Sequence, residues 1–551
     1  MRFSVSLLSA LALAAVGEAR DPRHVGRRSL TEMPRPRRGD LMRPASSANT
    51  QHTKRAEYLI PQNANTTKFA VNGSAIPEVD FDIGESYAGL LPISEKANET
   101  SELYFWFFPS SNVNATDEIT IWLNGGPGCS SLEGFFQENG PVLWQYGTYK
   151  PVKNPWTWVN LTNMVWVEQP VGTGFSQGTP TATSEEEVAA QFLGFFKNFV
   201  DTFGLHNKKI YITGESYAGY YVPYIADAML NTNDTTYYNL NSIMFYDPSV
   251  NSDVVLEQVP AVAFVDYWAP LFNLNDTFMA SLRSRADSCG YTSYLNDNLV
   301  FPPTGKLPTP PDDSAPGCDV WDAIYNAVSL TNPCFDIYQV ATTCPLLWDV
   351  LGFPGSFDYV PAGTGIYFNR SDVQRAINAP VQEWAECSNG VLDTDTSAPS
   401  SWEVIPRVLE RAERVVIGHG LLDFILLANG TLLTIQNMTW NGAQGFSKAP
   451  ADPFYVPYHA EASAATLAAA GVMGTTHTER GLTYVEVALS GHMIPQYQPS
   501  AAYRQLEFLL GRISSLSEVS DFTTQSGAFG NVAKNASAAV SRREMGVEWD
   551  V

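Results

Sequence analysis

The sequence predicts an α/β fold with a central, mostly parallel sheet and an inserted, disulfide-stapled subdomain. Segments of helical and strand-like pattern alternate through residues 184–230. Within this stretch, Ser216 stands between small residues where a strand passes into a helix. Residues 252–365 break the alternation with four of the six cysteines and several adjacent prolines. A chain of 551 residues is long enough for one large core that carries such an insertion.

Strands are predicted wherever short runs are rich in β-branched and aromatic residues. The helix predicted over 184–203 has the clearest pattern, because its apolar residues recur at helical spacing and Gly204 follows as a natural end. Ser184 and Glu187 match a capping box at its start. We interpret its phenylalanine stripe as core packing. The other expected helices are 217–230 and 501–512, and the expected strands are 102–108, 118–123, 164–167, 209–213, 414–418 and 482–489.

The chain divides into six predicted segments. Residues 1–19 resemble a secretory signal peptide, with Arg2 before a short apolar run. Residues 20–55 are basic and proline-rich and end in a dibasic pair, which we interpret as a cleaved propeptide, the alternative being a retained disordered tail. The catalytic core is expected at 56–251 and 366–514, an inserted, disulfide-stapled cap subdomain at 252–365, and a loosely held polar tail at 515–551.

The composition indicates a protein of the secretory pathway, expected outside the cell with the vacuole as the alternative. Six cysteines suggest three disulfides in an oxidising compartment, for which the sequence allows about 15 pairings. No apolar run after the signal peptide is long enough to span a bilayer. Eleven glycosylation sequons lie at Asn65, Asn72, Asn98, Asn114, Asn160, Asn233, Asn275, Asn369, Asn429, Asn437 and Asn535.

The net charge of −24 argues against nucleic acid as a partner, since proteins that bind it carry basic patches. An acidic surface suits solubility outside the cell or at low pH. It does not by itself identify a substrate.

The stretch 214–219, Gly-Glu-Ser-Tyr-Ala-Gly, has the form of the nucleophile elbow of α/β-hydrolases. A strained turn would project the Ser216 hydroxyl away from the backbone, and small neighbours would let other chain segments approach. The alternative is a strand-to-helix turn with an incidental serine. The rest of the sequence has to supply a base and an acid to decide between them.

A histidine and an aspartate follow later strands in the order that α/β-hydrolases use, which is serine, acid, histidine. Asp423 follows the strand at 414–418, and His492 follows the strand at 482–489. His419 also lies near a strand end and competes for the role of base. The ends of parallel strands are where α/β folds place their chemistry, so Ser216, Asp423 and His492 are the preferred triad.

A second glycine-rich turn, at 122–131, also follows a strand. Glycines allow backbone N–H groups to converge on an anion, as an oxyanion hole requires. The alternative is an ordinary structural turn. The spacing is not that of a phosphate-binding loop.

The chain resembles the serine carboxypeptidases, most closely the secreted fungal members. The resemblance extends over nearly all of residues 95–512. The motifs that carry it are WLNGGPGCSS at 122–131, FFQENGP at 135–141, EQPVGTGFS at 168–176, GESYAGYYVPYIA at 214–226, LLDF at 421–424 and GHMIP at 491–495.

The resemblance implies roles for particular residues. Ser216 would be the nucleophile, His492 the general base and Asp423 its orienting acid. The backbone N–H groups of Gly126 and Tyr217 would form the oxyanion hole. The free C-terminal carboxylate of the substrate would be bound by Asn124, Glu138 and Glu215.

The resemblance also implies an α/β-hydrolase fold, no cofactor and no metal ion, and a disulfide between Cys129 and Cys387. The remaining cysteines, Cys289, Cys318, Cys334 and Cys344, keep all three of their pairings open. Two loops depart from the family pattern: Gln496 and Tyr497 follow GHMIP where an acidic residue is common, and Gly420 begins the Asp423 loop where an acidic residue is often found.

The predicted function is that of a serine carboxypeptidase that removes C-terminal residues from peptides and proteins through an acyl-enzyme, with a preference for acidic pH. One alternative is an esterase or acyltransferase on the same scaffold, against which the set Asn124, Glu138 and Glu215 argues. The other is a catalytically silent binding or chaperone-like relative, which would be expected to lack a triad member.

Overall fold

The computed structural model describes residues 59–523, except residue 113 and the segments 353–364 and 460–467. The predicted signal peptide at 1–19, the predicted propeptide at 20–55 and the sequon at Asn535 lie outside the described residues.

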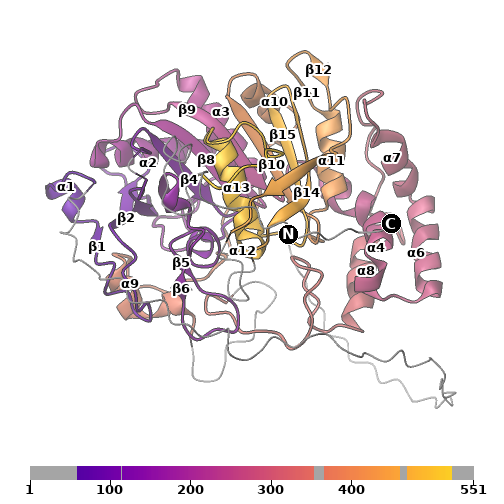
Figure 1. Cartoon of the computed structure of the whole chain (residues 1–551), viewed down its shortest axis with the longest axis horizontal. Coiled ribbons are helices and arrows are strands. Elements are labelled where there is room, and N and C mark those ends of the chain that lie inside the picture. The colour runs from indigo at the N-terminus through magenta and orange to yellow at the C-terminus, as the bar shows by residue number, and fades with distance from the viewer. Residues whose placement is uncertain (1–58, 113, 353–364, 460–467, 524–551) are drawn as a thin grey trace, which may run out of the picture. The chain divides into compact units, whose positions relative to one another are not determined.

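An 11-stranded sheet runs through the described part of the chain, with the order β1-β2-β3-β7-β4-β8-β9-β10-β15-β14-β13 (Figure 1). Its six central strands, β7 to β15 in that order, are parallel to one another. Antiparallel strands flank them on both sides. The strands are β1 (Ala70–Val71), β2 (Ser86–Pro92), β3 (Glu102–Phe108), β7 (Asn163–Glu168), β4 (Glu118–Leu123), β8 (Lys209–Glu215), β9 (Leu240–Tyr246), β10 (Arg414–Gly420), β15 (Leu482–Val487), β14 (Gly471–Glu479) and β13 (Asp452–Val456).

Apolar side chains cover both faces of this sheet. Along β3, successive side chains point to opposite faces. Phe105 thus belongs to one buried cluster and Trp106 to the other. Helices α2 (Glu185–Phe203) and α3 (Ala218–Thr232) contribute to the first cluster, and α13 (Pro499–Leu509) to the second. The predicted phenylalanine stripe of α2 is fully buried, which confirms its role in the core.

The start of α2 corrects one prediction. The Ser184 hydroxyl accepts a hydrogen bond from the N–H of Glu187 at 3.4 Å, as a capping box requires. The Glu187 carboxylate, however, accepts from the N–H of Thr183 at 2.8 Å and not from that of Ser184. The reciprocal half of the box is therefore displaced by one residue. At the other end Gly204 adopts the left-handed conformation (φ 68°) expected of a helix end.

A group of helices follows β9 in sequence and packs around its own apolar cluster. These helices lie together at the right of Figure 1, beyond α11 (Ala428–Asn437). Their cluster also includes Leu422 and Phe424, so its packing continues into the loop that carries Asp423. The elements are η3 (Val254–Gln258), α4 (Val259–Tyr267), α5 (Ala269–Phe272), α6 (Asp276–Ser288), α7 (Tyr291–Asn298) and α8 (Val320–Ser329).

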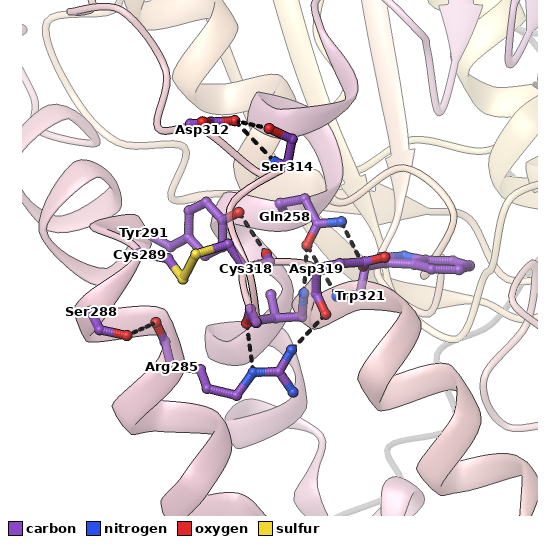
Figure 2. The surroundings of a disulfide bond; sticks show 12 residues. Gln258, Arg285, Ser288, Cys289, Tyr291, Asp312, Ser314, Cys318, Asp319 and Trp321 are labelled. Atoms are coloured by element: carbon purple, nitrogen blue, oxygen red, sulfur yellow. Dashed lines mark hydrogen bonds between the residues drawn. A yellow bond between two sulfur atoms is a disulfide. The ribbon is translucent and has the colours of Figure 1, made fainter.

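A disulfide between Cys289 and Cys318 ties the end of α6 to the segment that leads into α8 (Figure 2). The Tyr291 hydroxyl donates to the carbonyl of Cys318 at 2.7 Å. The Arg285 guanidinium donates to the carbonyls of Gly317 and Asp319 at 2.6 and 2.8 Å. The segment before α8 has no helix or strand of its own, and these hydrogen bonds and the disulfide fix its position.

The other two disulfides join Cys129 to Cys387 and Cys334 to Cys344. The first is the pairing that the family resemblance implied. Backbone hydrogen bonds on either side of it, from Ser130 N–H to the carbonyl of Glu386 at 2.7 Å and from Ser388 N–H to the carbonyl of Gly128 at 2.9 Å, align the two segments. The 387 segment therefore supports the glycine-rich loop directly.

Residues 515–523 correct the prediction of a loosely held tail beginning at 515. Leu516 and Phe522 are buried. The Phe522 ring packs against Trp156 at a centroid distance of 4.9 Å. The buried Arg504 donates to the Ser520 hydroxyl at 2.6 Å. One aliphatic side chain, Leu516, and one aromatic side chain, Phe522, therefore hold residues 515–523 against the core.

No helix among the described residues has the length and apolar content needed to cross a bilayer. The remaining short elements are α1 (Ala64–Thr67), η1 (Gly134–Glu138), β5 (Val142–Leu143), β6 (Val152–Lys153), η2 (Trp158–Asn160), η4 (Tyr367–Asn369), α9 (Ser371–Ala376), α10 (Val404–Leu409), β11 (Thr439–Trp440), β12 (Ala443–Gln444) and α12 (Ile494–Tyr497).

The disulfides are expected to stabilise the fold by an amount that grows with the logarithm of the length of chain they enclose. Cys129 and Cys387 are 258 residues apart, whereas Cys334 and Cys344 are 10 apart. In the chain-entropy model the first closure is worth about 5 kcal/mol and the second about 3 kcal/mol. Replacing both cysteines of the first pair by serine should therefore lower the free energy of unfolding more than the same change in the second pair. Denaturant titration measures both, and equal or reversed losses would contradict the model.

Candidate active site

Five strands that are neighbours in the sheet are each followed by a residue of the candidate site. Asn124 follows β4, Ser216 follows β8, and Asp247 follows β9 without an intervening residue. Asp423 lies in the loop after β10, and His492 in the loop after β15. Because these strands are parallel and paired in register, their carboxyl ends lie along one edge of the sheet. Distant parts of the chain thereby supply adjacent polar groups.

Ser216 occupies a strained turn between β8 and α3. Its φ is 62°, a conformation that is uncommon for a residue with a side chain. Two backbone hydrogen bonds hold it there, one from its N–H to the carbonyl of Tyr246 and one from the N–H of Ser249 to its own carbonyl, both 2.9 Å long. The side chain is half-buried. Strain at the serine is what a nucleophile elbow requires.

The glycine-rich loop packs backbone to backbone against this turn. A Cβ atom at Gly125 would lie 2.5 Å from the amide nitrogen of Tyr217 and 2.7 Å from Cβ of Ser216. Only glycine allows this approach. Gly126 follows with a φ of 111°, and Tyr217 is the cap of α3. The amides of Gly126 and Tyr217 thus belong to two segments in direct contact, at the positive end of a helix dipole.

His492 and Asp423 form a buried hydrogen-bonded pair. His492 Nδ1 lies 2.8 Å from Asp423 Oδ2. The other oxygen of Asp423 accepts from the N–H groups of Ile425 and Leu426 at 2.8 and 3.4 Å. Nε2 of His492 has no hydrogen-bond partner among the described residues, Ser216 included. Such catalytic bonds often form fully only when a substrate is bound.

The loop between Cys334 and Cys344 braces both partners of this pair. The N–H of His492 donates to the carbonyl of Tyr338 at 2.8 Å. The N–H of Phe424, beside Asp423, donates to the carbonyl of Ile337, also at 2.8 Å. One disulfide-closed loop therefore fixes the relative position of the acid and the histidine.

His419, the competitor for the role of base, serves a different purpose. It is fully buried, and burial lowers its pKa to about 4. Its Nε2 lies 2.7 Å from the carbonyl of Leu426, and its Nδ1 lies 3.2 Å from the Thr431 hydroxyl. Because both ring nitrogens are occupied within the protein, His419 has none to offer a substrate. Of these two histidines, His492 is the one with an available nitrogen.

The predicted carboxylate-binding residues meet around the side-chain amide of Asn124. Asn124 Nδ2 lies 2.9 Å from Glu215 Oε1 and 3.3 Å from Glu138 Oε1. Its Oδ1 accepts from Trp122 Nε1 at 2.7 Å, which fixes the orientation of the amide. All three residues are buried. Each glutamate keeps one buried oxygen without a hydrogen-bond partner among the described residues.

A third glutamate, which the sequence analysis missed, joins this cluster. Glu133 Oε2 lies 3.4 Å from Asn124 Nδ2, and Glu133 is also buried. Burial raises the pKa of Glu138 to about 7 and those of Glu133 and Glu215 well above the ordinary value of 4.5. The position of Glu133 within the 122–138 segment was the available signal, but the π-helical turn η1 that begins directly after it has no clear sequence pattern.

The described sequons are largely accessible. Asn160, Asn429 and Asn437 are half-buried. The others are exposed, and they are Asn65, Asn72, Asn98, Asn114, Asn233, Asn275 and Asn369.

A family model described as serine carboxypeptidase matches residues 77–511. The chain belongs to the serine carboxypeptidase family. A probable serine carboxypeptidase of Arthroderma benhamiae is 59% identical over 528 residues, which cover 94% of this chain and 98% of the relative. The serine-type carboxypeptidase F of Aspergillus niger is 51% identical over 462 residues, which cover 80% of this chain and 87% of the relative.

Among solved structures, that of Kex1 from Saccharomyces cerevisiae, a prohormone-processing carboxypeptidase, superposes with a TM-score of 0.65 at 22% identity and covers 82% of this chain and 98% of its own. The serine carboxypeptidase described here thus has an α/β-hydrolase fold with a disulfide-stapled helical cap. It is a serine-type exopeptidase, and its substrates are peptides.

The buried carboxyl groups of this carboxypeptidase should make its stability depend on pH. Burial raises the pKa of Glu138 and of Glu168 from 4.5 to about 7. Between these values the folded state binds protons that the unfolded chain has released, so the free energy of unfolding falls as pH rises. We expect the melting temperature, measured by calorimetry at constant ionic strength, to decrease from about pH 5 to about pH 7.

The matched control for this prediction is Glu138→Gln, which removes one titrating group from the cluster and should reduce the slope. A melting temperature that rises through the same pH window would contradict the assignment of these groups.

Proposed function

We propose that the enzyme releases C-terminal residues from peptides by acyl-enzyme catalysis, with Ser216 as nucleophile, His492 as general base and Asp423 as the acid that orients it. The observation that carries the proposal is the available Nε2 of His492, whose Nδ1 is held at 2.8 Å by a buried carboxylate. A neutral imidazole held in this way can accept the proton of a serine hydroxyl.

The proposed reaction proceeds in two halves. Ser216 Oγ attacks the last peptide carbonyl while His492 Nε2 takes its proton. The N–H groups of Gly126 and Tyr217 would stabilise the negative charge that develops on the carbonyl oxygen. His492 then gives its proton to the leaving amine, and the C-terminal residue departs. Water, activated by the same imidazole, hydrolyses the acyl-enzyme.

Asn124, Glu138 and Glu215 are proposed to bind the terminal carboxylate of the peptide. Three ionised carboxylates cannot share one small buried site, because like charges raise the pKa of at least one of them. With a pKa of about 7, Glu138 is protonated in acid, and a protonated carboxyl group can donate a hydrogen bond to the substrate. Glu215 directly precedes the proposed nucleophile in sequence, so the cluster lies beside it. A carboxylate-binding cluster there favours an exopeptidase over an esterase or acyltransferase, because the acyl donor of those enzymes offers no carboxylate.

The route of the protein in the cell is part of the proposal. A signal peptide at 1–19 would direct the chain into the secretory pathway. There residues 20–55 would be cleaved off as a propeptide, and the exposed sequons would receive glycans. We also propose the boundaries 56–251 and 366–514 for the core and 252–365 for the cap.

Ser216→Ala and His492→Ala should each lower kcat by about 10⁴-fold or more. Because the triad acts as a unit, the double variant should be little slower than either single variant. The assay is mass spectrometry of a peptide incubated with enzyme, in which the wild type produces a ladder shortened from the C-terminus. Additive losses, or a ladder that survives in Ser216→Ala, would show that a residue is misassigned. An organophosphorus fluoridate should label Ser216 alone.

The carboxylate cluster predicts different pH profiles for two kinds of substrate. For free-acid peptides kcat/KM should fall as pH rises through about 7, because Glu138 then ionises and repels the substrate. The matching C-terminal amides bring no third charge, so their kcat/KM should hold or rise over the same range.

The control variants are Glu138→Gln and Glu215→Gln, whose amides keep a donor at every pH and should flatten the free-acid profile. Parallel profiles for the two substrates would mean that the glutamates only brace the glycine-rich loop.

A further inference from the structure

A second buried aspartate adjoins the proposed triad. Asp247 follows β9, between the strand that precedes Ser216 and the strand that precedes Asp423. Its side chain is fully buried, as is that of Asp423. One carboxylate oxygen of each aspartate and one ring nitrogen of His492 lie within 4.8 Å of one another.

The two oxygens of Asp247 have different surroundings. Oδ1 accepts a hydrogen bond from the N–H of Gly420 at 2.7 Å, in the loop that leads to Asp423. Oδ2 is buried and has no hydrogen-bond partner among the described residues. A charged oxygen left in that state would be strongly unfavourable.

No cation in the described residues compensates a second negative charge at this position. The groups that ion-pair with these aspartates within 4.0 Å are two imidazoles. His419 Nε2 is 3.5 Å from Asp247 Oδ1, but it lies closer to the carbonyl of Leu426, at 2.7 Å. His492 is engaged with Asp423.

Two adjacent carboxyl groups in such surroundings can be accommodated if one of them keeps its proton. Asp423 is the better anion, because it accepts from two backbone N–H groups and from His492. Burial, and then the neighbouring charge of Asp423, raise the pKa of Asp247 well above its ordinary value. The proton therefore belongs on Asp247.

We propose that Asp247 is a neutral positioning residue, which accepts from Gly420 through Oδ1 and donates from Oδ2 to the carboxylate of Asp423. It would thereby hold Asp423 in line with His492, in addition to the contacts made by the 334–344 loop. The inference rests on the proposed roles of Asp423 and His492.

This arrangement makes opposite predictions for two replacements of nearly equal size. In Asp247→Asn the amide oxygen can accept from Gly420 and the NH₂ group can donate to Asp423, so kcat should stay within about threefold of the wild type. In Asp247→Leu both bonds are lost and Asp423 is free to shift. A misplacement of this kind can reduce kcat by about 10²-fold, with KM little changed.

The charge state of Asp247 can be measured without activity. The infrared difference spectrum of wild type minus Asp247→Asn, recorded near neutral pH, should show the carbonyl stretch of one protonated carboxyl group. A carboxylate band in its place would overturn the proposal even if Asp247→Leu fails to fold. Loss of activity in Asp247→Asn equal to that in Asp247→Leu would overturn it too, because a negative charge would then be required. Full activity in Asp247→Leu would exclude a positioning role.

Ser216→Ala separates this inference from the proposed function. If that variant keeps its activity, the triad assignment fails, whereas the infrared result still reports on Asp247 alone.

Discussion

The parallel register of β4, β8, β9, β10 and β15 is the constraint on which the site depends. Each strand ends at the same edge of the sheet, which brings five residues from positions 124 to 492 close together. Contacts between the loops then complete the site, among them the close approach of Gly125 to the Ser216 turn and the disulfides Cys129–Cys387 and Cys334–Cys344. A one-residue slip of one of these strands would turn its side chains to the opposite face of the sheet and displace the functional residue that follows it.

The edge of the sheet is also where the protein buries acids without matching cations. Four of these acids lie in low-dielectric surroundings, and burial is the main cause of their raised pKa values. They are Glu133, Glu138, Glu215 and Asp247. In such surroundings a carboxyl group is a hydrogen-bond donor for as long as it keeps its proton. The same chemistry would serve the proposed binding of the substrate carboxylate, the proposed support of Asp423 and the stability of the fold in acid.

The sequence alone predicted the α/β class, most of the central strands and the residues at four of the five strand ends. Ser216 and Asn124 were found because glycines mark tight turns, and Asp423 and His492 because they follow recognisable strands. Asp247 was missed because β9 itself was missed: its first half, Leu240-Asn241-Ser242, is too polar to resemble a buried strand. The pairs Cys289–Cys318 and Cys334–Cys344 depend on how helices approach in space, which local sequence patterns do not encode.

The loop between Cys334 and Cys344 bears on the order in which the candidate site is assembled as the chain is made. The loop encloses a short stretch of chain, so it can close soon after it emerges from the ribosome. It then carries the carbonyl groups of Ile337 and Tyr338 that receive Phe424 and His492. His492 is made near the end of the chain, long after the serine and the aspartate. The residues that receive Phe424 and His492 therefore precede both of them in synthesis, so the last residue of the site to be made packs against a loop that already exists.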